Sequence, residues 1–391
     1  MRLSPRDAHP RVRLAVELLF TALAALALYW AWRADLRYCE RHLLPRHFAW
    51  DDESPAIARR WRKLGVVVGL VLLFVVRPLF GRWAGRRSAR EALVDFARYA
   101  VAVLLALVVS EIALRVTHRA AAPDRTHAIE VRIGQPDARL GWVFTPSKKN
   151  VIGHMDGPIE YAVNADGNRA SSVEDDPDYA APTLLFSGES ITVGHGLPWE
   201  DTYPAIVGKA FGLQVVDLGV HGYGSDQAFV RLADRLARFK NVIAVVSIFH
   251  PPMLVRMREN DHPHLVFPIG SGAPVVTPPE DELRITRVFH NVIPYHDDST
   301  YEGLKEILRE TDRRARAQGA KAVFVYPQFD HEVPRRDAWM VDELFHEQGL
   351  TVVDTNFGFE PLPGDPHPNG ASTRRLAEAI VEALWGELPP G

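Results

Sequence analysis

Three apolar runs near the N-terminus constrain the fold of this 391-residue chain more than any other feature. They extend over Leu18–Trp32, Leu64–Val76 and Tyr99–Ser110. With their flanking residues, they approach the roughly 17 to 25 residues that a helix needs to cross a bilayer. We therefore expect residues 1–125 to form an all-α membrane anchor, with transmembrane helices at about 12–32, 64–80 and 96–115.

The charge distribution divides the chain at the same place. Residues 1–125 contain 21 Lys and Arg against 11 Asp and Glu, and the remainder contains 24 against 38. The formal net charge of −4 is therefore the sum of +10 and −14. Aromatic residues near the predicted helix ends favour a membrane over the alternative, a buried soluble helical bundle: these are Tyr29, Trp30, Trp32 and Trp61.

The acidic remainder is expected to form two further domains. Residues 126–181 contain short alternating runs separated by Pro, Asp and Gly, which predicts a β-rich collar. In residues 182–391, apolar runs alternate with helical stretches, which is typical of α/β proteins with a parallel five-stranded sheet covered by helices on both faces. The five predicted strands are 183–186, 214–218, 242–249, 321–326 and 351–353. A long Pro-, Gly- and His-rich connection at about 253–300 predicts a lid-like insertion.

The ends of the first and last predicted strands carry the side chains of a nucleophilic site. In open α/β sheets, sites form beyond the carboxyl ends of the strands. Ser190 follows the first strand within a glycine-containing turn, and Asp365 and His367 follow the last strand in a Pro-flanked loop. A serine nucleophile needs an imidazole base, and the imidazole needs an acceptor that orients it. On its own, each feature also fits a helix cap or a polar turn.

Together these segments resemble the SGNH or GDSL-type hydrolases, a family of esterases and acyltransferases. The resemblance covers roughly residues 139–385 and includes Gly188-Glu189-Ser190, with Glu in place of the usual Asp. It implies a three-layer, flavodoxin-like domain in which Ser190 is the nucleophile and Asp365 and His367 complete the catalytic triad. It also implies an oxyanion hole formed by the backbone of Ser190 and of Gly219, which lies in Leu218–Gln227.

In the segment after the third predicted strand, this chain departs from the family's pattern. An Asn side chain usually completes the oxyanion hole after the third strand, but Pro252 stands where that Asn is expected. His250 and Asn260 are the two candidates that we consider as substitutes. Losing one oxyanion donor typically costs about 10²- to 10³-fold in rate.

The resemblance implies a membrane-anchored serine esterase that cleaves carboxylic ester bonds through an acyl-enzyme. It requires no metal and no organic cofactor. The expected substrate carries an ester, for example as an acylated glycan or lipid, and the other expected partners are the lipid bilayer and a membrane acyltransferase. No nucleic acid is expected. Two alternatives remain: an O-acyltransferase acting on a cell-envelope glycan or lipid, and a non-catalytic binding scaffold with the same fold.

Two other kinds of site are less well supported. The glycines 219, 222 and 224 follow a strand, but their spacing is the reverse of the dinucleotide-binding pattern. Several His and Asp residues lie between 250 and 298 without the helical spacing of a metal-ligand pair. The single Cys39 excludes an intramolecular disulfide framework.

The orientation in the membrane is not determined by the arginines that flank the runs. With the N-terminus inside, basic residues number 10 on the cytoplasmic side and 11 on the other, so the positive-inside rule does not choose between the two topologies. The chain is expected to be a multi-pass membrane protein. The catalytic domain is expected outside the cytoplasm because membrane-tethered relatives of this type usually work there.

Overall fold

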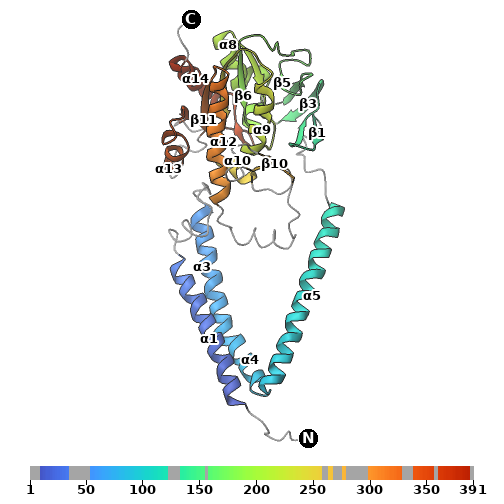
Figure 1. Ribbon diagram of the computed structural model, residues 1–391, viewed down its shortest axis with the longest axis vertical. Helices are drawn as coiled ribbons and strands as arrows, with labels where there is room; N and C mark the ends of the chain where they lie inside the picture. The colour runs from blue at the N-terminus through green and yellow to red at the C-terminus, as the bar shows by residue number, and fades with distance from the viewer. Residues whose placement is uncertain are drawn as a thin grey trace. The chain divides into compact units, whose positions relative to one another are not determined.

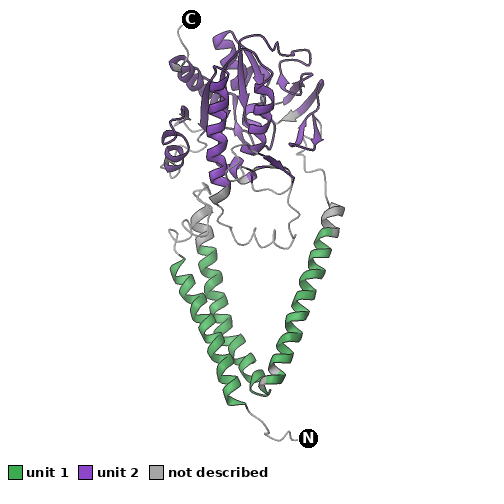
Figure 2. Cartoon of the chain, in the orientation of Figure 1, with its two compact units in different colours: residues 1–122, 282–296 green, residues 123–281, 297–391 purple. Residues whose placement is uncertain are grey.

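The computed structural model describes residues 9–34, 53–121, 133–154, 157–257, 263–266, 275–278, 298–327, 338–355 and 360–387. The chain divides into two compact units, which are residues 1–122 with 282–296 and residues 123–281 with 297–391 (Figure 2). Figure 1 traces their helices and strands along the chain.

The first unit is helical in its described residues. Its elements are α1 (Pro10–Arg33), α3 (Glu53–Val71), the π-helix η1 (Leu72–Val76), α4 (Arg77–Ala84) and α5 (Ala89–Ala121). Three stretches are long and apolar enough to cross a membrane: Pro10–Arg33, Arg59–Ala84 and Leu93–Arg115. They coincide with the three predicted helices.

Small residues bring α1 and α3 close together. A Cβ atom added at Gly65 would lie 2.8 Å from the Cβ of Ala31, and one added at Gly69 would lie 2.6 Å from the Cγ of Leu28. Two glycines four residues apart lie on one helix face, so they let the two backbones approach, as small residues do between membrane helices. Pro78 follows closely after η1 and lacks the N–H that an α-helix needs, which accounts for the local change in winding.

Two of the three acidic residues within the apolar stretches, Glu17 and Glu111, have arginine partners four residues away on their own helices. Arg13 Nε lies 2.7 Å from Glu17 Oε1, and Arg115 Nε lies 2.6 Å from Glu111 Oε1. Residues four apart face each other on a helix. Glu111 therefore has an arginine one turn away.

The second unit contains an eight-stranded sheet in the order β12-β11-β8-β6-β7-β5-β4-β3. The first five strands in this order pair in parallel, as predicted. They are β6 (Thr183–Ser187), β7 (Gln214–Asp217), β8 (Val242–Ile248), β11 (Lys321–Pro327) and β12 (Val352–Thr355). Every residue of β6 is buried, which is typical of a central strand with both faces covered.

The connections of the parallel strands place helices on both faces. The helices are α7 (Ser190–Val193), α8 (Tyr203–Phe211), α9 (Ser225–Leu236), α10 (Pro251–Arg256), α12 (Asp298–Ala317), α13 (Ala338–Val341) and α14 (Gly370–Glu387), with the short helices η2 (Trp199–Asp201) and η3 (Asp342–His346). The chain moves from β6 to β7 and then back past β6 to β8. Because crossovers are right-handed, this reversal puts α8 and α9 on opposite faces. In the structure, α8 packs with α14, and α9 packs with α12.

The strand order makes the gap between β6 and β8 the place to look for a site. Numbered along the chain, the parallel strands lie in the order 2-1-3-4-5, which is the flavodoxin-like arrangement. Ligands in such sheets bind where the winding direction changes, beyond the carboxyl ends of the first and third strands. Ser190 follows the first of these strands and His250 follows the third.

The segment predicted as a separate collar lies in the same compact unit as the α/β domain. Three of its strands, β3 (Lys148–His154), β4 (Gly157–Val163) and β5 (Arg169–Ala170), extend the sheet antiparallel beyond β7. The hairpin of β1 (Gly134–Asp137) and β2 (Gly141–Phe144) forms a second sheet. Two further hairpins are β9 (His264–Val266) with β10 (Val275–Thr277) and β13 (Pro361–Leu362) with β14 (Asp365–Pro368). Most of the predicted lid lies outside the described residues.

Candidate active site

Ser190 lies at the start of α7, in the turn that follows β6. The chain approaches β8 closely here, because a Cβ added at Gly188 would lie 2.2 Å from Ile248 Cγ2. Glu189 caps the helix, since its Oε1 accepts a hydrogen bond from the Ile191 N–H at 2.9 Å. The N-cap is therefore Glu189, which leaves the hydroxyl of Ser190 for other contacts.

The structure brings together the three residues predicted to form the triad. His367 Nε2 lies 2.8 Å from Ser190 Oγ, and His367 Nδ1 lies 2.5 Å from Asp365 Oδ1. Asp365 and His367 both belong to β14, where residues two apart point to the same face. The imidazole thus lies between a hydroxyl and a carboxylate, which is the geometry that general-base activation of a serine needs.

Asp365 is held in its charged form by His367. Partial burial disfavours the carboxylate, but hydrogen bonds from the His367 N–H and ring outweigh this effect and lower the pKa of Asp365. The backbone N–H of His367 donates to Oδ1 at 2.8 Å. A carboxylate that accepts these bonds keeps the Nδ1 proton on the imidazole and leaves Nε2 able to accept a proton.

A second histidine contacts the same carboxylate. His195 Nε2 lies 3.3 Å from Asp365 Oδ2, and its Nδ1 lies 3.1 Å from Nε2 of the buried His221. Burial, followed by the charge of neighbouring His195, lowers the pKa of His221 well below its usual range, so His221 is neutral. Within the described chain, His221 Nδ1 has no hydrogen-bond partner. The hydrogen-bonding pattern therefore assigns the His221 proton to Nε2 and directs the Nε2 proton of His195 to Asp365.

Glu189 forms a buried charged cluster beside Ser190. Its carboxylate lies 3.1 Å from His250 Nε2 and 3.3 Å from Arg256 Nη1, and it also accepts from the Ser190 hydroxyl. Burial opposes its ionisation, but the contacts with His250, Arg256 and Ser190 outweigh burial and lower the pKa of Glu189 well below its usual range. His250, a predicted oxyanion donor, therefore directs Nε2 to Glu189 instead.

Gly219, another predicted oxyanion donor, lies against Asp217 and α7. The Gly219 N–H donates to Asp217 Oδ1 at 2.8 Å, and a Cβ added at Gly219 would lie 2.9 Å from the Val193 nitrogen of α7. Burial raises the pKa of Asp217 to about 7, against the hydrogen bond from Gly219. Asn260 lies outside the described residues.

The loop that carries His195 is held by two strands of the predicted collar. The buried guanidinium of Arg169, on β5, donates to the carbonyls of Val193, Gly194 and Leu197. It also lies 4.2 Å from the ring centroid of Tyr161, on β4, whose hydroxyl accepts from the Gly196 N–H at 2.7 Å. Sequence reasoning missed His195, His221 and Arg169. The burial of Arg169, the first residue of β5, marks it in the structure, since buried arginines need partners, but burial is not visible in the sequence.

One group of residues within the described ranges has the composition of a metal site. The ligand atoms of His195, Asp365 and His367 lie within 4.8 Å of one another. The contacts between these residues already account for that proximity. Of the histidines considered as metal ligands from the sequence, His262, His290 and His296 lie outside the described residues.

Comparisons with known proteins return structural similarity alone. No protein-family model and no curated protein sequence matches the chain. Similar solved structures include TesA, which is 20% identical and matches 53% of this chain and 99% of its own with a TM-score of 0.35. A lipolytic G-D-S-L family member from Veillonella parvula DSM 2008 is 12% identical over 52% of this chain and 97% of its own, with a TM-score of 0.32. Esterase EstA from Pseudoalteromonas sp. is 11% identical over 52% and 97%, with a TM-score of 0.33.

Proposed function

We propose that this chain is a membrane-anchored serine esterase that hydrolyses O-acyl bonds through an acyl-enzyme. The observation that carries the proposal is the contact of 2.8 Å between Ser190 Oγ and His367 Nε2, with Asp365 on the other side of the ring. The apolar helices of the first unit support the anchor.

In the proposed reaction, His367 Nε2 takes the Ser190 proton as Oγ attacks the ester carbonyl. Asp365 stabilises the imidazolium that forms, and His367 then protonates the leaving alcohol. Water attacks the acyl-enzyme with His367 again as the base, and this step releases the acid and restores Ser190. In each half of the reaction, His367 therefore gives up the proton that it has taken.

The negative charge on the carbonyl oxygen is proposed to be stabilised by backbone N–H groups of Ser190 and Gly219. The Gly219 N–H already donates to Asp217, so the oxyanion shares this donor with a buried carboxylate. Protonation of Asp217 would weaken that competition, and its pKa of about 7 allows it near neutral pH.

Glu189 affects the resting state of the proposed nucleophile. The Ser190 hydroxyl has one proton and two neighbouring acceptors, the Glu189 carboxylate and His367 Nε2. Because Glu189 is charged, it competes with His367 for that proton. We propose that the Ser190 hydroxyl rotates from Glu189 toward His367 before it attacks the bound substrate.

A serine-reactive fluorophosphonate probe on detergent-solubilised full-length protein tests the proposal. Wild type should be labelled, Ser190→Ala should not, and His367→Asn should be labelled much more slowly. Ser187→Ala is the matched control, because Ser187 is buried three residues earlier and donates to the Ala228 carbonyl. Equal labelling of wild type and Ser190→Ala would reject the nucleophile assignment, and no labelling of either would favour a non-catalytic binding scaffold.

The second candidate function is transfer of the acyl group to a hydroxyl of a cell-envelope glycan or lipid. The membrane-compatible helices favour it, because they would keep the site near envelope substrates and near a membrane acyltransferase partner. Release of p-nitrophenol from short-chain esters without an acceptor supports the esterase, and turnover only with a polysaccharide acceptor supports transfer. A reporter fused to the C-terminus tests the proposed location outside the cytoplasm.

A further inference from the structure

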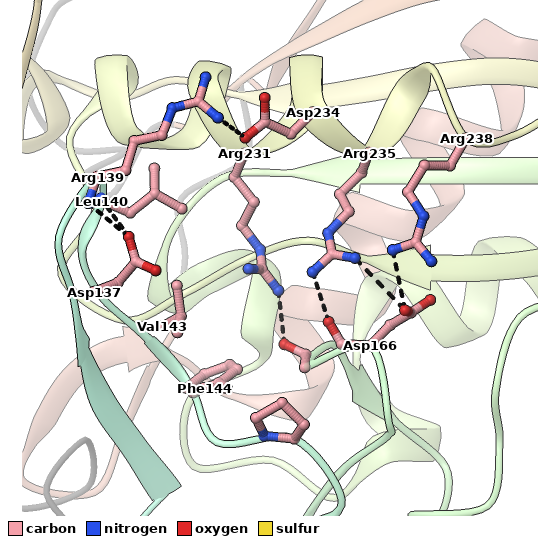
Figure 3. A pocket seen from close by; sticks show the side chains of 12 residues that line it. Asp137, Arg139, Leu140, Val143, Phe144, Asp166, Arg231, Asp234, Arg235 and Arg238 are labelled. Carbon is pink, nitrogen blue, oxygen red and sulfur yellow. Dashed lines mark hydrogen bonds and ion pairs between the residues drawn. The ribbon is translucent and has the colours of Figure 1, made fainter.

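A cavity of about 390 Å³ lies in the second unit, and none of the residues proposed for catalysis lines it. The hairpin of β1 and β2, the turn between β4 and β5, and α9 line it (Figure 3). Its volume falls at the lower end of the range for small-molecule sites, which is roughly 300 to 1,000 Å³.

The charged lining of the cavity has one arginine more than it has acidic residues. Four arginines and three aspartates face it: Arg139, Arg231, Arg235, Arg238, Asp137, Asp166 and Asp234. Figure 3 shows Arg231, Arg235 and Arg238 directed from the helix side toward the turn, whereas Arg139 comes from the hairpin and is directed toward Asp234 on α9. The excess charge is therefore positive by one unit if all seven groups are ionised.

Each aspartate is already engaged. Asp166 lies 3.1 Å from Arg238 Nη1 and 3.5 Å from Arg235 Nη1. Asp234 lies 2.6 Å from Arg139 Nη1, and Asp137 accepts the backbone N–H groups of Arg139 and Leu140, both at 2.8 Å. Among the four arginines, Arg231 is therefore the one without a carboxylate in contact in the described chain, and Asp137 and Asp217 act on it from beyond contact distance.

Arg231 is buried without a carboxylate partner. Its side chain is 3% exposed, and no carboxylate of the described chain lies within 4.0 Å of its nitrogens. Its Nε donates to the Leu218 carbonyl at 3.0 Å, and Nη2 donates to the Gly167 carbonyl at 2.6 Å and to Asn168 Oδ1 at 2.9 Å. Nη1 has no such bond to another residue that the structure describes. A buried charge without a carboxylate in contact is costly, so an anion that reached Nη1 would be favoured.

The hairpin side of the cavity has an apolar part. It consists of Leu140, Val143 and Phe144, which lie below and beside Arg139 and Asp137 in Figure 3. A lining with a charged part and an apolar part suits a ligand that has an anionic group at one end and a compact carbon skeleton at the other. A sugar acid or a sugar phosphate has both features.

We infer that this cavity binds a carboxylate or phosphate group carried on a ligand of monosaccharide size, with Arg231 as the principal anchor. Charged hydrogen bonds from a guanidinium to such oxygens are among the strongest that side chains make. The site goes beyond the proposed esterase, because its lining contains none of the residues proposed for acyl transfer.

The experiment measures the binding of D-glucuronate, inorganic phosphate and D-glucose to the detergent-solubilised full chain by calorimetry at constant ionic strength. Glucuronate or phosphate should bind, and glucose should bind at least about tenfold more weakly, the effect of losing a hydrogen bond to a charged group. Tighter binding of glucuronate than of phosphate would identify a sugar acid, and the reverse would identify a phosphorylated ligand.

Three variants make the test specific. Arg231→Gln should weaken anion binding by at least about tenfold. Val143→Trp fills the cavity from its apolar part and should abolish binding, which keeps the test decisive if Arg231→Gln does not fold. Arg313→Gln, an exposed arginine paired with Glu310 on α12, is the control and should bind as wild type does. Equal affinity for glucuronate and glucose, or unchanged binding in Val143→Trp, would overturn the inference.

Discussion

The imidazole rings of His195 and His367 stack with their centroids 4.1 Å apart and their planes 29° apart. Both rings face Asp365, one at each carboxylate oxygen. The proposed catalytic base is therefore fixed from two sides: Asp365 sets its tautomer, and His195 limits the rotation of both the ring and the carboxylate. This relationship makes His195 a positioning residue for the proposed reaction.

Substitution of His195 tests that role. His195→Phe keeps a stacking ring but loses the donor to Asp365, so kcat should fall about 10- to 100-fold, the effect of one hydrogen bond to a charged group. KM should stay within about twofold, because His195 is not expected to bind substrate. His195→Gln, which offers an amide donor, should recover part of kcat. Equal losses in both variants, or a change in KM alone, would contradict the role.

Asp217 should make stability fall as pH rises. Its pKa of about 7 in the folded chain exceeds the ordinary value of 3.8, so the folded state binds more protons between these values and loses stability as pH rises through that window. Asp217→Asn keeps an acceptor for the Gly219 N–H without the charge. Relative to wild type, it should gain stability from pH 4 to pH 8, up to the order of 4 kcal/mol. Thermal unfolding at several pH values measures this, and parallel curves for the two proteins would refute it.

Ionisation of Glu189 should make the stability of the fold rise as pH rises. Its folded-state pKa lies well below the ordinary 4.5, so its stabilising contribution is present above pH 4.5 and is lost as pH falls below it. Glu189→Gln should lower stability at pH 7 and flatten the acid limb of the stability profile. Glu189→Ala leaves His250 and Arg256 without their carboxylate and should cost about 3 to 5 kcal/mol at pH 7. An unchanged acid limb in Glu189→Gln would show that other groups dominate acid unfolding.

Arg169 should connect the antiparallel strands β4 and β5 to the loop that carries His195. Arg169→Met removes the donors to three buried carbonyls, each of which costs about 1 to 3 kcal/mol when left unsatisfied. The melting temperature of the second unit should fall by several degrees, and esterase activity should fall further as the loop of His195 loosens. Arg316→Gln, an exposed change on α12, is the comparison and should have little effect. A melting temperature for Arg169→Met equal to that of Arg316→Gln would contradict the linkage.

The alternation of short apolar runs and helical stretches was enough to predict the five parallel strands. The ends of β6 and β8 match the prediction to within a residue, because buried parallel strands are near-continuous apolar runs with polar turns after them. The antiparallel extension by β3, β4 and β5 was not predicted, since short alternating strands do not indicate which sheet they join.

The partners of the candidate site were harder to predict. His195 and His221 lie 26 residues apart, and Arg169 holds the loop of His195 through the carbonyls of Val193, Gly194 and Leu197. Such contacts depend on backbone geometry, and no spacing pattern encodes them. The expected role of His250 as an oxyanion donor rested on its position after β8 and stays a prediction, and the structure adds a contact between its Nε2 and Glu189. Asn260 stays a prediction.

Trapping of an acyl group on Ser190 tests the central claim most directly. Full-length protein mixed with p-nitrophenyl acetate and quenched in acid should show an early burst of p-nitrophenol, close to one per protein. Peptide mass spectrometry should then find the acetyl group on Ser190. The same treatment of Ser190→Ala should give neither signal. Turnover without an acetyl group on Ser190, or turnover by Ser190→Ala at the wild-type rate, would contradict the account.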